Sequence, residues 1–181
     1  LKNVATLEAS LGNVNEAILA AKAMVESAPG STSSHEFLAD ICFRFGENDQ
    51  GMNALREAVR ISGDDPEMTI KLAMALSQQL QTEEAVEVYW RAFEKFESID
   101  DRTSLIDKLV PLYQELNQVD SLLGRLERAR SDERQRRSMT ICLAQAWQSL
   151  GDLGLARTEL EKLLVQESRD TRLLKQLATV C

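Results

Sequence analysis

A short pattern recurs along the whole chain at an almost constant spacing, and this period limits the possible folds more than any other feature. Five turn-like stretches, four of which begin with Gly or Asn, each lead into a position that is usually occupied by a small residue. These positions are 34, 34, 37 and 34 residues apart, and they are Ala17, Gly51, Ala85, Leu122 and Ala156. A period of this length indicates a stack of similar supersecondary units, none of which can bury its apolar face alone.

A second set of positions recurs with the same period. Twelve residues before each member of the first set lies Ala5, Ala39, Ala73, Val110 or Ala144, and Ala178 continues the series. The residue before each of these is Val or Leu, and apolar residues follow the first set after four and seven positions. Small side chains let two helices approach closely, and the apolar residues complete one helical face. We therefore predict that each unit is a pair of helices.

The pattern also predicts where the helices lie. The first helices are expected near 1–10, 33–45, 66–79, 103–115, 137–149 and 171–181, and the second helices near 14–28, 48–61, 82–96, 118–131 and 152–167. Pro111 falls inside one first helix and cannot donate a hydrogen bond to the Asp107 carbonyl. We therefore expect a kink or a local break at that point.

The fifth unit carries the pattern most completely, with Ala144, Trp147, Leu150-Gly151-Asp152, Leu153, Ala156 and Leu160. On these residues the sequence resembles the tetratricopeptide repeat family, whose 34-residue unit is two antiparallel helices. The resemblance covers the whole chain. It implies an all-α fold, a right-handed alpha-alpha superhelix of about five helix pairs plus a terminal helix. The expected units are about 1–31, 32–65, 66–102, 103–136, 137–170 and a partial unit at 171–181.

The expected last helix leaves an apolar face without a second helix to cover it. Leu173, Leu174 and Leu177 would lie on that face. We therefore expect that the parent protein continues beyond this segment, and that exposed terminal helices allow a homo-oligomer.

Charge and composition argue against several classes of function. The formal net charge of −8 disfavours nucleic acid as a partner, because phosphate binding comes from Lys and Arg. No apolar run is long enough for a membrane span, no phosphate-loop motif occurs, and no His/Cys cluster has metal-ligand spacing.

Cys42, Cys142 and Cys181 do not form a disulfide framework, which favours a cytoplasmic location. His35 is seven residues from Cys42, about 10 Å along a helix and too far for a nucleophilic pair. We expect a protein that is not an enzyme and holds no metal or cofactor.

The resemblance also implies a binding surface, because in this family the first helices line a concave groove that holds peptide segments of partner proteins. The residues expected on this surface are Glu36, Asp40, Phe43, Arg44, Met74, Gln78, Asp107, Gln114, Glu115, Gln145 and Gln148. Acidic and amide side chains predominate among them, which predicts a neutral-to-basic peptide. Asp40 can pair with Arg44 one turn later, whereas Asp107 and Glu115 have no basic neighbour at helical spacing.

The most probable function from the sequence is therefore a scaffold for protein–protein interaction. One alternative is a non-catalytic targeting or regulatory arm of a larger enzyme. A less favoured alternative is an RNA-binding helical repeat, against which the acidity and the 34-residue period both argue.

Overall fold

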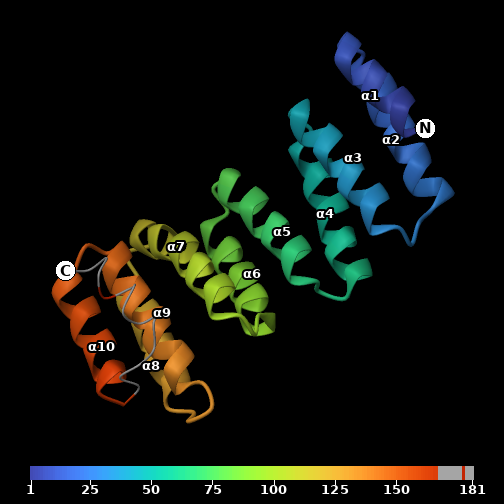
Figure 1. Cartoon of the computed structure of the whole chain (residues 1–181). Helices are drawn as coiled ribbons and strands as arrows, with labels where there is room; N and C mark the ends of the chain where they lie inside the picture. The colour runs from blue at the N-terminus through green and yellow to red at the C-terminus, as the bar shows by residue number, and fades with distance from the viewer. Residues whose placement is uncertain (167–176, 178–181) are drawn as a thin grey trace. The chain divides into compact units, whose positions relative to one another are not determined.

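In the computed structural model, residues 1–166 and 177 are described, and they form helices with no strand among them (Figure 1). The helices are α1 (Lys2–Leu11), α2 (Val14–Ser27), α3 (Thr32–Arg44), α4 (Asn48–Ser62), α5 (Pro66–Gln78), α6 (Thr82–Lys95), α7 (Ile99–Glu115), α8 (Val119–Arg130), α9 (Arg136–Ser149) and α10 (Leu153–Gln166). The predicted all-α fold is confirmed. Every end of α1 to α10 lies within one residue of its predicted position except the start of α7. The helix predicted at 171–181 lies outside the described residues except for residue 177.

The chain divides into two compact units, residues 1–94 and 95–181. In the first unit, α1 packs against α2 and α3 packs against α4, while α2 contacts α3 and α4 contacts α5. A hydrogen bond between Ser77 and Tyr89 joins α5 to α6. In the second unit, α7 packs against α8 and α9 packs against α10, and α9 also contacts α7 and α8. The helices are therefore packed in sequential pairs, as the period predicts.

The small-residue positions form the contacts at the centre of each pair. The side chains at Ala5, Ala39, Ala73, Val110 and Ala144 are at most 3% exposed, and those at Ala17, Ala85, Leu122 and Ala156 are fully buried. Two helices whose facing side chains are this small can bring their backbones close together, and larger side chains nearby fill the remaining space. The burial of these positions, which we predicted from the sequence period, is confirmed.

Helix α7 differs from the prediction in two ways. It begins at Ile99 because Ser98 caps it and accepts a hydrogen bond from the Asp101 amide, so the acidic stretch before residue 103 is helical. It also continues through Pro111 to Glu115, so the helix is not broken there, and the other expectation, a kink, stays a prediction. Leu109, Val110 and Tyr113 are buried on the two sides of the proline. Their burial offsets the cost of about 3 kcal/mol that an interior proline imposes.

The first helix exposes an apolar face, defined here as the α1 face, that consists of Leu1, Val4, Leu7 and Leu11. Their exposed fractions lie between 51% and 65%. The residues that occupy the position of Val4 in three later units, Leu72, Leu109 and Leu143, are at most 2% exposed. In those units the corresponding face is covered by other helices of the array.

The apolar residues expected near the C-terminus are only partly described. Leu173 and Leu174 lie outside the described residues, whereas Leu177 packs against the cluster formed by Ile141, Ala144, Ala156, Leu160 and Leu163.

We expect Ala73→Trp and Ala144→Trp each to destabilise the fold by about 3 kcal/mol or more, because an indole cannot fit between closely packed helices. The free energy of unfolding, measured from urea denaturation, tests this. Glu67→Trp is the control, since Glu67 is exposed on α5 and should change stability by no more than about 0.5 kcal/mol. If neither variant lowers the free energy of unfolding appreciably, these alanines do not lie at the contact between paired helices, and the proposed packing is contradicted.

Candidate functional site

A groove of about 360 Å³ lies in the first unit between α3 and α5, with one residue of α4 at its base. This α3–α5 groove is lined by Glu36, Asp40, Phe43, Leu55, Lys71, Met74, Ala75 and Gln78. Five of these residues were predicted from the sequence: Glu36, Asp40, Phe43, Met74 and Gln78. The structure thus brings together residues from two successive first helices, and their role in binding stays a prediction.

Helical spacing places the lining residues on facing sides of the groove. Glu36, Asp40 and Phe43 follow one another at intervals of four and three residues on α3, so they share one face. On α5 the intervals are reversed, with three residues from Lys71 to Met74 and four from Met74 to Gln78. The start of each helix is fixed by a cap. Ser31 accepts a hydrogen bond from the Ser34 amide at 3.3 Å, and Asp65 accepts one from the Met68 amide at 3.1 Å.

The apolar part of the groove depends on a glycine in α4. Gly51 stands where other units have alanine or leucine, and a Cβ atom at this position would lie 2.7 Å from Cε1 of the Phe43 ring. The absence of a side chain lets the ring lie directly on the α4 backbone. Leu55 and Ala75 are buried beneath the groove, while Met74 is 42% exposed at its edge. The groove therefore offers an accessible apolar surface.

The charges in the groove are unevenly compensated. Glu36 forms an ion pair with Lys71 across the groove, and the hydrogen bond from Lys71 to Glu36 raises the pKa of the lysine. Asp40 has neither a hydrogen bond nor an ion pair in the described part of the chain. Partial burial raises the pKa of its carboxyl group, and the nearby Glu36 carboxylate raises it further, although Lys71 and Lys2 act in the opposite direction.

The expected pair between Asp40 and Arg44 does not form. The Arg44 guanidinium instead lies over the ring of Phe45, 5.8 Å from the ring centroid, and Arg44 does not line the groove. Neighbours at helical spacing can pair only when their rotamers converge, and here the aromatic ring provides another contact for the cation.

Two predicted residues meet in the second unit. Asp107 Oδ1 accepts hydrogen bonds from Gln145 Nε2 at 2.7 Å and from Ser149 Oγ at 2.6 Å. This Asp107 cluster joins α7 to α9. Asp107 was expected to have no basic neighbour at helical spacing, and its two donors are neutral side chains of the next first helix along the chain.

The remaining predicted residues are not brought into either group. Gln114 and Glu115 are exposed at the end of α7, and Gln148 is half-buried on α9. Sequence reasoning missed Lys71, which follows Glu36 by 35 residues, one period plus one position. This spacing between opposite charges in adjacent units is a signal that could have identified the pair.

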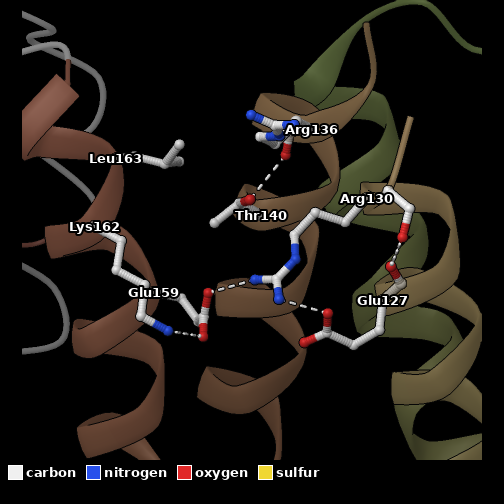
Figure 2. A pocket seen from close by; sticks show the side chains of 8 residues that line it. Glu127, Arg130, Arg136, Thr140, Glu159, Lys162 and Leu163 are labelled. Atoms are coloured by element: carbon white, nitrogen blue, oxygen red, sulfur yellow. Dashed lines mark hydrogen bonds and ion pairs between the residues drawn. The ribbon is translucent and has the colours of Figure 1, made fainter. Parts of the chain in front are cut away.

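A second pocket, of about 370 Å³, lies between α8, α9 and α10 (Figure 2). Arg130 is at its centre and forms ion pairs with Glu127 and, at 2.8 Å, with Glu159. Lys162 also pairs with Glu159 at 2.8 Å. Figure 2 shows Glu127 and Glu159 reaching the Arg130 guanidinium from its two sides. The pair with Glu159 joins α8 to α10, and Arg136, which also lines the pocket, lies 3.9 Å from Glu133.

A third pocket, between α4 and α6, is also lined by ion pairs within the chain. Arg56 pairs with Glu84 at 3.0 Å, and Arg91 pairs with Asp64 at 3.5 Å. Its charges are also matched within the chain.

The described residues contain no group of His, Cys, Asp and Glu side chains arranged to hold a metal ion. His35 is buried, and its Nε2 lies 3.0 Å from the Pro29 carbonyl oxygen. Cys42 is fully buried, and burial raises the pKa of its thiol, which disfavours the thiolate that a nucleophile requires. In the described part of the chain no helix combines the length and apolar character that crossing a membrane needs.

Comparison with known proteins identifies the fold but not a sequence family. No family model matches the sequence, and no curated protein sequence is significantly similar to it. Solved structures are similar over nearly the whole chain. The crystal structure of MamA protein has a TM-score of 0.55 at 16% identity, covering 94% of this chain and 91% of that one.

Two further solved structures have comparable similarity. A tetratricopeptide repeat protein from Parabacteroides merdae has a TM-score of 0.55 at 14% identity and covers 97% of this chain and 69% of that one. YrrB, described as a TPR protein with an unusual peptide-binding site, has a TM-score of 0.51 at 13% identity and covers 96% of this chain and 88% of that one. The paired helices, the buried small-residue positions and these similarities agree, and the chain has the fold of tetratricopeptide repeat proteins.

Proposed function

We propose that this chain is a protein-interaction module that binds a peptide segment of a partner protein in the α3–α5 groove. The observation that carries the proposal is the composition of the groove. It combines an apolar surface, made by Phe43 and the partly exposed Met74, with the polar side chains of Asp40 and Gln78 at its rim. Binding sites commonly join an apolar surface with a few polar groups that fix the orientation of the ligand.

The other two pockets support the choice of this groove by contrast. Arg130 and Arg56, one in each pocket, already pair with Glu159 and Glu84 of neighbouring helices, so a ligand would have to displace these contacts. The groove has an accessible apolar surface and an acid, Asp40, that has no partner within the described residues. YrrB, which has a similar fold, is described as having a peptide-binding site, and this also favours a peptide as the ligand.

A photo-crosslinking experiment tests the proposal. Peptides are first selected from a phage-displayed library of random dodecapeptides against the whole chain. Replacing Met74 by p-benzoylphenylalanine should then give crosslinks to the selected peptides, because this position borders the groove. The control carries the same replacement at Asn53, which is exposed on α4 and does not line the groove.

Crosslinking at position 53 alone, or equally at both positions, would contradict binding in the groove. Selection of no peptide, together with a gel shift of single-stranded RNA that is strongest at low salt, would favour the RNA-binding alternative instead.

Gly51→Ala tests the apolar part of the site separately. The added Cβ should push the Phe43 ring into the groove and lower the affinity of the selected peptides about threefold or more, as expected when an apolar contact is lost. Stability should change by no more than about 1 kcal/mol, because the better helix propensity of alanine offsets the displaced ring. Isothermal titration calorimetry and urea denaturation measure the two effects.

Gly124→Ala is the matched control for this variant. Gly124 is also inside a helix, but a Cβ there would meet only the end of Arg128 at 3.9 Å. It should stabilise the chain by about 0.5–1 kcal/mol and leave peptide affinity unchanged. An unchanged affinity in Gly51→Ala would show that the Phe43 ring does not contribute to the site.

We also propose that two copies of the chain associate through the α1 face. The four residues of this face are apolar and exposed, so two identical faces can meet around a two-fold axis without any need for complementary charges.

The double variant Val4→Glu, Leu7→Glu should shift the chain from dimer to monomer in sedimentation velocity, because two-fold contact would bring its new carboxylates together. Leu19→Glu is the control, since Leu19 is 65% exposed on α2 and is not part of the α1 face. A wild-type chain that stays monomeric at all concentrations would contradict the association.

A further inference from the structure

The α3–α5 groove has one acidic charge more than its own cations compensate. Two of its charged side chains, Glu36 and Lys71, form an ion pair with one another. The third, Asp40, lies one helical turn after Glu36 on the same face of α3 and has no partner in the described part of the chain. The groove therefore has one uncompensated carboxylate next to its apolar surface.

No nearby cation of the chain is in position to compensate this carboxylate. Lys2 lies over the ring of Phe37, with its Nζ 5.4 Å from the ring centroid, and Arg44 lies over Phe45. Lys71 acts on Asp40 only at longer range while it pairs with Glu36. In the described part of the chain no cation pairs with Asp40, which leaves its carboxylate accessible to a cation from another molecule.

The Asp40 side chain is exposed, so solvent screens its charge and only a small destabilisation accompanies its ionised form. Burial and the Glu36 carboxylate raise the pKa of Asp40, which means that folding disfavours its charged form. A cation bound beside it would reverse that effect. By contrast, the Asp107 carboxylate already serves within the fold as the acceptor for Gln145 and Ser149.

The surroundings of Asp40 also suit the rest of a long basic side chain. Phe43 lies one turn further along α3, and Met74 faces it from α5 with 42% of its surface exposed. The aliphatic stem of lysine or arginine packs on surfaces of this kind while its charged end reaches a carboxylate.

We propose that the bound peptide is anchored by a lysine or arginine side chain that pairs with Asp40, with its stem and a neighbouring apolar residue packed against Phe43 and Met74. This inference rests on the proposed function and specifies the chemistry of the ligand. The occupant is a basic-apolar segment of a partner protein.

A double-mutant cycle tests the anchor. Peptides selected from the random library should contain a Lys or Arg, and replacing that residue by norleucine should lower affinity for the wild-type chain about three- to fivefold. In Asp40→Asn the native peptide should bind about three- to fivefold more weakly than to the wild-type chain, and the norleucine peptide should lose nothing further. Asp40→Glu, which keeps the charge, should restore part of the affinity.

Asp49→Asn is the matched control for the change in net charge. Asp49 is exposed in the first unit, on α4, and does not line the groove, so its removal should leave affinity and its salt dependence unchanged. An equal loss in Asp49→Asn and Asp40→Asn would overturn the anchor in favour of a general effect of charge.

The failure of this inference can be separated from failure of the proposed function. Peptides that crosslink at position 74 but contain no cation, or whose affinity is unaffected by Asp40→Asn, would overturn the anchor and leave groove binding intact. Peptides that do not crosslink at position 74 would overturn both.

Stability provides a second readout, which a purely structural role for Asp40 would not give. In the unbound chain, Asp40→Asn should raise the urea midpoint at neutral pH, because it removes an ionised group that folding disfavours. The gain should start to shrink as the pH falls through the raised pKa of folded Asp40, and it should be gone below the ordinary pKa of aspartate, where the carboxyl group is neutral in both the folded and the unfolded state. The charged groups around it are Glu36, Lys71 and Lys2. A lower midpoint in Asp40→Asn at neutral pH would identify the carboxylate as structural and overturn the proposal.

Discussion

Close contact between paired helices at the small-residue positions is the constraint on which the rest of this structure depends. Alanines such as Ala39, Ala73 and Ala85 have no exposed surface, and their size lets the helices of a pair approach one another. Because the same contact recurs with each unit, residues one period apart occupy equivalent places on adjacent helices. The α3–α5 groove and the Asp107 cluster both follow from this, since each is formed by residues of successive first helices.

The sequence predicted the helices well because their positions depend on local periodicity and on turns that begin with glycine or asparagine. It failed where a local rule competed with packing or capping. Ser98 extends α7 by four residues at its start, and buried neighbours keep that helix intact through Pro111. Five residues of the groove were also predictable, because helical spacing and the repeat phase together determine which positions share a face.

The pairing of charges was not predictable from neighbours within a helix. Asp40 and Arg44 have the spacing of an ion pair but do not form one, whereas Asp107, without a suitable neighbour on its own helix, is hydrogen-bonded by two residues of α9. Partners across units are brought together by the fold, at separations such as the 35 residues between Glu36 and Lys71. The structure therefore distinguishes acids that stabilise the array from Asp40, which has no partner among the residues that the structure describes. The proposed anchor depends on that distinction.

Methionine methyl resonances test the central claim, that the α3–α5 groove is the binding surface, most directly. The chain has five methionines, of which Met74 borders the groove and Met139 is fully buried in the second unit. When a selected peptide is titrated into chain labelled with ¹³C at the methionine methyl groups, we expect the Met74 resonance to shift progressively and the Met139 resonance to remain in place. A shift of Met139 with no change at Met74 would contradict binding in the groove.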